Sequence, residues 1–232
     1  MLGHMVYNYL STKDDCELTT TDLRWPDNDF KKKMLDFDGD YVVNCIGAIH
    51  QRKNQFDVNI DLPIWLDKNL EGCNVVHPGT DAEIDDDDYG KSKRKSTEYL
   101  VDKGTITKII KTSIIGYELN TNASLLQWFL TTDIEEMGGW SEHYWNGITT
   151  LQWSKICYEM MLDWDWFKVV NVPGTECISK YELVNIFKKI YNKKIKITKD
   201  NSISANKCQD VEISTPSIEK QLKEMKKYYE GN

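Results

Sequence analysis

The sequence lacks the cysteine spacing that marks a zinc site or a disulfide-stapled domain. Its six cysteines include no Cys-x-x-Cys pair and lie far apart, at Cys16, Cys45, Cys73, Cys157, Cys177 and Cys208. This arrangement predicts neither a zinc centre nor a disulfide framework. We therefore expect reduced thiols and a cytoplasmic location, because disulfides are rare in that compartment.

Long apolar runs and an excess of basic residues are also missing. No run approaches the ~20 apolar residues of a transmembrane helix, and the N-terminus lacks the charged-then-apolar layout of a signal peptide. The 29 basic and 37 acidic residues give a net charge of −8, which argues against a general nucleic-acid or anionic-membrane surface. A local basic pocket for a phosphorylated ligand remains compatible with this charge.

The sequence does contain enough apolar side chain for a core. Of its 232 residues 40% are hydrophobic, and 8 are tryptophans, so the chain can form one large globular domain or two small ones. A run of acids at 36–40 lacks the remaining ligands of a calcium loop. We expect a solvated turn there and no metal site.

Strand-like and helix-like segments alternate through the first half of the chain. Strands are expected at 17–22, 41–47, 74–76 and 105–112, and helices at 1–10, 58–66 and 89–101. This alternation predicts an α/β fold with a parallel sheet covered on both faces. From residue 120 an aromatic-rich segment follows, whose rings are expected mostly in a core. A strand then returns near 168–172, before a helix capped by Ser179 and a last helix that begins at Thr215-Pro216.

Tyr89 and Lys93 are four residues apart at the start of a predicted helix, which places both side chains on one face. A cation that favours the ionised phenol makes tyrosine a better proton relay at neutral pH. Upstream, Thr80-Asp81 follows a predicted strand and places a hydroxyl at the end where open α/β sheets bind ligands.

These three residues together resemble the catalytic triad of the short-chain dehydrogenase/reductase superfamily. The chain is most similar to the extended reductases of nucleotide-linked sugars, and among them to the dTDP-4-dehydrorhamnose reductase group. The similar blocks keep the family's order along nearly the whole chain: Met1-Leu2-Gly3, Asn44-Cys45-Ile46-Gly47, Asn59 with Leu62-Pro63, Thr80-Asp81, Tyr89 to Lys93, Thr112 to Gly116, Asn146 to Thr150, and Ser179 to Leu183.

The resemblance implies a Rossmann-like, doubly wound parallel sheet with its first strand missing. Residues 1–120 would form the incomplete dinucleotide-binding domain. Residues 121–232 would form a smaller substrate-binding portion, with the strand near 168–172 returning to the sheet. A nucleotide-sugar substrate is implied, with no nucleic acid and no membrane, and a homodimer is left open.

The implied cofactor is NADP or NAD, held by residues spread along the first domain. Asp22 lies about 20 residues after Gly3, where a dinucleotide fold places the acid that holds the adenosine ribose. Arg24 beside it would instead favour the 2′-phosphate of NADP, so the preference stays open. Asn44 and Gly47 resemble the family's cofactor turn, and Tyr89 and Lys93 would also contact the cofactor.

The implied reaction is reduction of a 4-keto-6-deoxy sugar. Tyr89 would protonate the carbonyl oxygen, Thr80 would hydrogen-bond the developing alkoxide, and Lys93 would hold the nicotinamide ribose and lower the pKa of the tyrosine. Asn146 and Thr149 are the expected substrate-binding residues.

Two departures from the family pattern lead us to expect weak dinucleotide binding. The sequence begins inside the phosphate loop, so the central first strand and the first two glycines are absent. Nine positions separate Thr80 from Tyr89, where relatives carry a much longer loop. Strands flanking the missing one would have unpaired backbone groups unless they close up.

Other functions on the same scaffold compete with the reductase. A sugar 4,6-dehydratase usually has Asp-Glu after the threonine, whereas here Thr80-Asp81 is followed by Ala82. A bifunctional epimerase-reductase needs a further acid/base pair, which Cys157, His77 and His143 do not clearly supply. A regulatory or binding subunit without catalysis is the remaining alternative.

Overall fold

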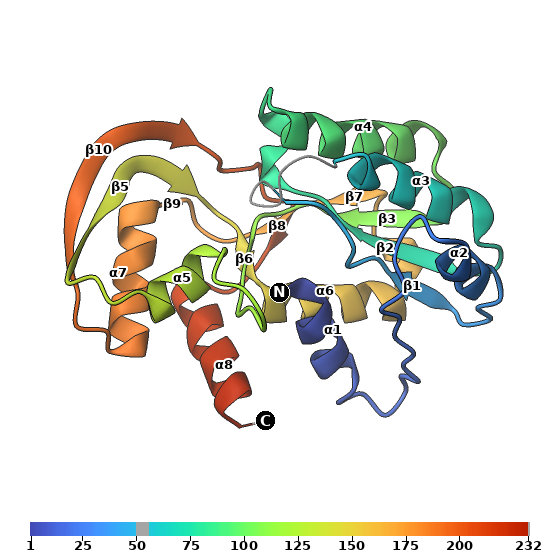
Figure 1. Cartoon of the computed structure of the whole chain (residues 1–232), viewed down its shortest axis with the longest axis horizontal. Helices are drawn as coiled ribbons and strands as arrows, with labels where there is room; N and C mark the ends of the chain where they lie inside the picture. Colours follow the sequence, from blue (N-terminus) through green and yellow to red (C-terminus); the bar gives the residue numbers. More distant parts are fainter. Residues whose placement is uncertain (50–55, 232) are drawn as a thin grey trace. The chain divides into compact units, whose positions relative to one another are not determined.

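The computed structural model describes residues 1–49 and 56–231, which form two compact units (Figure 1). The sheet unit comprises Tyr7–Lys111 and Ile156–Asn171, and the second unit comprises Met1–Val6, Thr112–Lys155 and Val172–Asn232. The sequence-based division has its boundary at residue 120, whereas in the structure the chain leaves the sheet unit at Lys111 and returns to it from Ile156.

A four-stranded parallel sheet organises the sheet unit. Its strands are β1 (Tyr41–Val43), β2 (Asn74–Pro78), β3 (Thr107–Ile110) and β7 (Val170–Asn171), in the order β1-β2-β3-β7. Val42 aligns with Val75, and Ile109 aligns with Val170. The predicted α/β class with a parallel sheet is confirmed.

Helices lie on both sides of this sheet (Figure 1). Helices α3 (Val58–Asn69) and α4 (Asp88–Lys103) pack against each other on one side, and residues from Ile156 onward in α6 (Thr150–Leu162) lie on the other. The short α2 (Asn28–Leu35) contributes to a hydrophobic cluster with α3 and β2, formed by Phe30, Met34, Leu62, Leu66, Leu70, Cys73 and Val75. Burial of these side chains is what fixes α3 against the sheet.

The strand expected at 17–22 is not present, and this prediction was wrong. The threonine-rich segment has β-branched residues, but strand propensity needs a partner strand to act on, and none lies beside it in the described sheet. Within the residues that the structure describes, β1 is consequently an edge strand.

The second unit is built from a second sheet and short parallel pairs. The long strands β5 (Glu136–Trp145) and β10 (Lys196–Asn206) pair in parallel, and β9 (Ile178–Ser179) pairs antiparallel with β5. The remaining pairs are β4 (Ile114–Ile115) with β6 (Ile148–Thr149), and β8 (Pro173–Gly174) with β11 (Ile213–Ser214). Strand β10 is eleven residues long.

Helices α5 (Leu125–Thr131), α7 (Lys180–Tyr191) and α8 (Ile218–Glu230) complete this unit. Helix α1 (Leu2–Leu10) crosses the boundary between the units. Helix α7 begins as predicted at Ser179, whose hydroxyl accepts a hydrogen bond from Glu182 N while the Glu182 carboxylate accepts one from Ser179 N. Such a capping box satisfies two backbone donors of the first turn.

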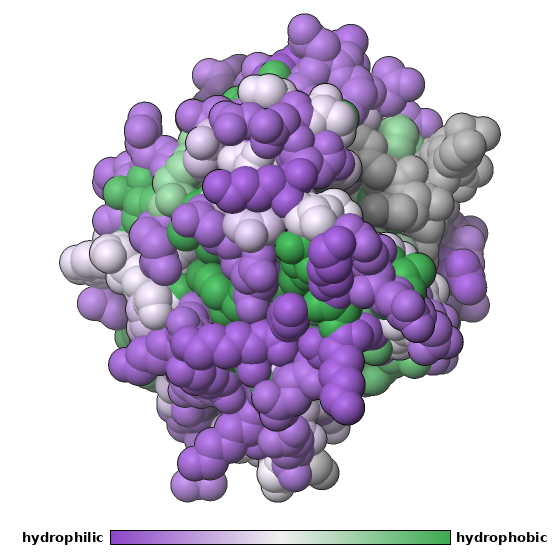
Figure 2. All heavy atoms as spheres, turned by 90° about the vertical axis from the view of Figure 1, so that its left-hand side faces the viewer, coloured by the Kyte–Doolittle hydropathy of each residue, from purple (hydrophilic) through white to green (hydrophobic). Residues whose placement is uncertain are grey.

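The aromatic side chains divide between core and surface. In the second unit Trp145, Trp153, Phe129 and Phe187 are fully buried, whereas Trp140 is 40% exposed. Figure 2 shows the face that carries β5, β10 and α7, where hydrophilic atoms predominate and hydrophobic patches lie between them. No helix among the described residues is long and apolar enough to cross a membrane.

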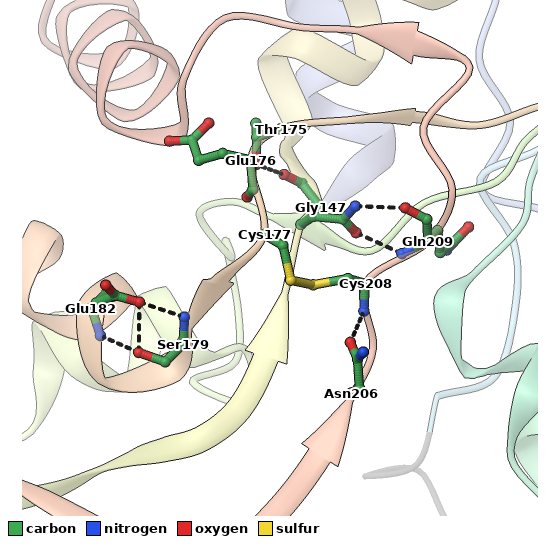
Figure 3. Close-up of a disulfide and its surroundings, with 10 residues drawn as sticks. Gly147, Thr175, Glu176, Cys177, Ser179, Glu182, Asn206, Cys208 and Gln209 are labelled. Carbon is green, nitrogen blue, oxygen red and sulfur yellow. Dashed lines mark hydrogen bonds between the residues drawn. A yellow bond between two sulfur atoms is a disulfide. The ribbon is translucent and has the colours of Figure 1, made fainter.

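The prediction that the cysteines form no disulfide was wrong for one pair. Cys177 and Cys208 are bonded in the second unit, with their Cα atoms 5.9 Å apart (Figure 3). The sequence spacing gave no signal because 31 positions separate the two residues. Strands β9 and β10 bring them together by flanking β5 on opposite sides. Cys16, Cys45, Cys73 and Cys157 remain free thiols.

A glycine near the start of α4 fixes how closely this helix approaches the loop before it. A Cβ atom on Gly90 would clash with the carbonyl oxygen of Ala82 and lie 2.8 Å from that of Asp85. Gly→Ala normally stabilises a helix interior, but here we expect Gly90→Ala to destabilise the fold by about 1–3 kcal/mol, the usual cost of overpacking. Thermal unfolding measures this, with the exposed Lys91→Ala as the control; a melting temperature equal to or above that of the wild type would contradict the close approach.

Candidate active site

Thr80 lies just beyond the C-terminal end of β2, where it caps a short 3₁₀ helix, η1 (Asp81–Ile84). Its hydroxyl accepts a hydrogen bond from Ala82 N (3.3 Å) and donates one to Asp81 Oδ1 (3.2 Å). Glu83 closes the capping box from the other side by accepting from Thr80 N (3.5 Å). The loop geometry therefore holds the Thr80 side chain in place at the carboxyl end of the parallel sheet.

The acidic run at 85–88 is used to start α4. Asp87 is the N-cap residue, and its carboxylate accepts a hydrogen bond from Gly90 N at 2.7 Å. Asp88 adds a negative charge in the first turn, which the helix dipole favours. The run thus places Tyr89 in the first turn and Lys93 one turn later, as their spacing predicts.

Tyr89 is half-buried beside Thr80, and its ring makes an edge contact with Phe56 at a centroid distance of 5.9 Å. Burial raises the pKa of the Tyr89 phenol, and the nearby carboxylates of Asp81, Glu83 and Asp87 raise it further, while a hydrogen bond with Thr80 lowers it. The expected lowering of this pKa by Lys93 is therefore not what the geometry produces, because desolvation and negative charge dominate.

Lys93 is a buried cation. Its side chain is 6% exposed, and Nζ donates a hydrogen bond to the Pro78 carbonyl oxygen at 3.0 Å. Burial lowers the pKa of Lys93 to about 8, and the negative charge of Glu83 opposes this shift. An ammonium group has three N–H donors, so the bond to Pro78 leaves capacity for a ligand.

Glu83 is the buried carboxylate whose charge opposes the lowering of the Lys93 pKa. It is 4% exposed, forms an ion pair with Lys111 Nζ at 2.8 Å and accepts a hydrogen bond from Thr97 Oγ1 at 3.0 Å. A buried charge is tolerated when it is paired and hydrogen-bonded. Glu83 therefore connects η1, α4 and the segment after β3.

Asn44 forms the turn that follows β1. Its Oδ1 accepts a hydrogen bond from Ile46 N (3.0 Å), and its Nδ2 lies 3.0 Å from Nδ1 of the buried His77. Burial, followed by the charge of Lys93, keeps the pKa of His77 well below its ordinary value. A neutral imidazole can accept the amide proton of Asn44.

Asn59, at the start of α3, fixes the next part of this turn. Its Oδ1 accepts from Ala48 N (2.8 Å), and its Nδ2 donates to Ala48 O (3.1 Å) and to Ser92 Oγ (3.1 Å). A Cβ atom on Gly47 would lie 3.1 Å from Asn59 Oδ1 and 4.0 Å from Lys93 Nζ. The exposed Gly47 therefore brings open backbone close to the buried ammonium.

The structure brings together Thr80, Tyr89, Lys93, Asn44 and Gly47, but not every residue expected to bind the cofactor. Asp22 and Arg24 are exposed and lie on an irregular segment instead of following a strand. Gly3 belongs to α1, in the stretch assigned to the second unit.

The two expected substrate-binding residues lie in the second unit and have internal partners. Asn146 is 7% exposed, and its amide exchanges hydrogen bonds with the backbone of Gln209. Thr149 is fully buried, and its backbone N donates to Gln221 Oε1 at 2.9 Å. In this conformation Thr149 positions the β6 segment and presents no side-chain surface.

Sequence reasoning missed the supporting residues His77, Glu83 and Ser92. The signals were local: a polar residue inside the apolar strand β2, and a Thr-x-x-Glu capping pattern after it. Among the described residues, no three side chains of His, Cys, Asp or Glu gather as a metal site.

Comparisons with known proteins show which fold the chain has. No protein-family model and no curated protein matches the sequence. A dTDP-4-dehydrorhamnose reductase from Clostridium acetobutylicum is similar in structure, with a TM-score of 0.78 and 15% identity over 99% of this chain and 96% of that one.

Two further reductases are similar. The dTDP-4-dehydrorhamnose reductase of Yersinia enterocolitica has a TM-score of 0.72 and 11% identity over 99% of this chain and 96% of that one. That of Bacillus anthracis, solved in complex with NADP, has a TM-score of 0.67 and 11% identity over 83% and 80%. The chain therefore has the Rossmann-like fold of these reductases.

The lowered pKa of Lys93 gives a testable stability effect in the protein without cofactor. A lysine whose pKa is about 8 when folded and ordinary when unfolded binds fewer protons in the folded state, so stability rises as the pH increases from about 8 toward 10. Lys93→Met should remove this term. The free energy of unfolding of Lys93→Met minus that of the wild type should be about 2 kcal/mol lower at pH 9.5 than at pH 7, because only the wild type gains stability over this range.

Chemical denaturation at the two pH values measures the difference, and the exposed Lys95→Met on the same helix is the control. Equal differences at both pH values for Lys93→Met would show that Lys93 is not a desolvated cation.

Proposed function

We propose that the protein is an NAD(P)H-dependent reductase of a nucleotide-linked 4-keto-6-deoxy sugar. The observation that carries this proposal is the arrangement of Tyr89, Lys93 and Thr80: phenol and buried ammonium are one helical turn apart, beside a hydroxyl at the carboxyl end of β2. Open α/β sheets bind their ligands at this edge. The similarity to three reductases of this class supports the same assignment.

Tyr89 is the proton donor in this proposal. Because its pKa is raised by burial and by neighbouring carboxylates, the phenol stays protonated at neutral pH and can give its proton to the carbonyl oxygen of the sugar. The Thr80 hydroxyl, fixed by the capping box of η1, donates a hydrogen bond to the same oxygen as its negative charge develops. To do so it rotates its hydrogen away from Asp81.

The residues around Lys93 fit the nicotinamide half of a dinucleotide. The Asn44–Gly47 turn exposes backbone beside the ammonium. Lys93 can therefore donate hydrogen bonds to the hydroxyls of a ribose that lies against this turn. When bound, the dinucleotide supplies the hydride. Asp22 and Arg24 are the candidates for the adenosine ribose and its 2′-phosphate, and the N-terminus of α1 at Gly3 is the candidate for the pyrophosphate.

The substrate would be positioned through the segment that contains Asn146 and Thr149. Both residues are buried and bonded to backbone or to Gln221, so they would set the position of this segment rather than contact the sugar by themselves. A cytoplasmic location stays a prediction, because the four free thiols fit a reducing compartment whereas the Cys177–Cys208 disulfide does not. A homodimer stays a prediction that analytical ultracentrifugation tests.

Tyr89→Phe should leave the fold and cofactor binding intact and lower the turnover of ketosugar reduction about 100-fold or more, because the proton donor is lost. NADPH oxidation with a nucleotide-linked 4-keto-6-deoxy sugar measures the rate, and calorimetry measures NADPH binding. Tyr99→Phe is the matched control, since Tyr99 is a half-buried tyrosine on the same helix and should retain full activity.

Two outcomes would contradict the proposal. Undiminished reduction by Tyr89→Phe would remove Tyr89 as the donor. Sugar binding by the wild-type protein without any reduction, in the presence of bound NADPH, would instead identify a non-catalytic binding subunit on the same scaffold.

A further inference from the structure

Three segments of the second unit meet at the Cys177–Cys208 disulfide (Figure 3). Cys177 directly precedes β9, and Cys208 follows the end of β10 by two residues. The third segment is the end of β5, which lies between these strands in the sheet. At this end Trp145 aligns with Ile178 of β9, and Tyr144 aligns with Asn206 of β10. The disulfide therefore joins the two neighbours of β5 where β5 ends.

Asn146 is the first residue after β5, and residues close to the two cysteines hold it from both sides. Its side-chain Nδ2 donates to Gln209 O (2.9 Å), and Gln209 N donates to Asn146 Oδ1 (3.0 Å). On the other side, Thr175 N donates to the Asn146 carbonyl oxygen at 3.0 Å. Gln209 follows Cys208 directly, and Thr175 precedes Cys177 by two positions.

The disulfide is accessible to a reductant. Cys177 is exposed and Cys208 is half-buried, in contrast to the buried free thiols of Cys73 and Cys157. Exposed disulfides are the labile and regulatory ones, and thiol–disulfide exchange requires that a thiolate reach one of the sulfur atoms.

We propose that Cys177 and Cys208 form a redox-sensitive latch that fixes the Asn146–Gly147 segment when oxidised and loosens it when reduced. The reductant is a dithiol. One of its thiolates attacks a sulfur of the pair and releases the other cysteine as a thiolate, and its second thiol then resolves the mixed disulfide. The two cysteines gain two electrons and two protons, and the dithiol becomes a disulfide.

Reduction acts on the segment through the chain between the two cysteines. The disulfide closes a loop with a sequence separation of 31, and opening it restores conformational freedom to the residues on either side. The hydrogen bonds from Gln209 N and Thr175 N to Asn146 should then open more often. That this change alters sugar binding rests on the proposed function; the latch itself does not.

Hydrogen exchange of the full chain tests the latch, with dithiothreitol as the reductant. The amides of Gln209 and Thr175 should exchange at least about tenfold faster in the reduced protein, while the Ile109 amide, which donates to Val169 O in the sheet unit, should not change. Alkylation in denaturant should count four thiols before reduction and six after it. In the double variant Cys177→Ser, Cys208→Ser the two amides should exchange as fast as in the reduced wild type, and dithiothreitol should not change their rates.

Cys16→Ser is the matched control and should keep the full response. Six thiols in protein oxidised with glutathione disulfide, or equal exchange of Gln209 and Thr175 in both states, would overturn the latch. In the activity arm, reduction should raise the KM for the ketosugar several-fold at unchanged NADPH affinity. A protein that reduces no ketosugar in either state refutes the proposed function, while the exchange measurement still decides the latch.

Discussion

The candidate site depends on the burial of one ammonium group, that of Lys93. Its hydrogen bond to Pro78 ties α4 to the end of β2. Besides burial, its charge lowers the pKa of His77, and the charge of Glu83 raises the pKa of Lys93 against the effect of burial. Burying a cation costs free energy unless neighbours compensate, and here one carbonyl oxygen and one nearby carboxylate do so incompletely. The incomplete compensation lowers the lysine pKa and leaves donors for a polar ligand.

Burial and nearby charges also set the protonation states of Tyr89 and His77. Burial raises the pKa of Tyr89 and the carboxylates of Asp81, Glu83 and Asp87 raise it further, against a hydrogen bond with Thr80, so the phenol holds its proton. His77 stays neutral and can accept a hydrogen bond from Asn44. Pairs of titratable groups whose pKa values are pushed apart by their surroundings are typical of acid–base sites. In the proposed function the lysine is the binding group and the tyrosine is the acid.

Much of the sheet unit could be predicted from the sequence because its signals are local. Helix α4 was expected at 89–101, with Tyr89 and Lys93 on one face, and β2 was expected from a short apolar run. The strand expected at 17–22 failed because strand formation depends on a partner that the described sheet does not provide. The raised pKa of Tyr89 could not be foreseen, since it depends on burial and on carboxylates that the η1 turn brings back toward the helix.

In the second unit, too, local patterns could be predicted from the sequence and contacts between distant residues could not. Ser179 and the helix after it were predicted to the residue, because a capping box is a local pattern. The length of β10 and its parallel pairing with β5 were not, because they join residues about 60 positions apart. The Cys177–Cys208 bond follows from that pairing, so no reading of cysteine spacing could have found it.

Isotope transfer tests the central claim most directly. The protein is incubated with NADPH that carries deuterium at the transferable position of C4 and with a nucleotide-linked 4-keto-6-deoxy sugar, and the product is examined by NMR. The account predicts one deuterium on C4 of the product sugar and one equivalent of oxidised cofactor per product. Product without deuterium at C4, or no product while both ligands are bound, would contradict it.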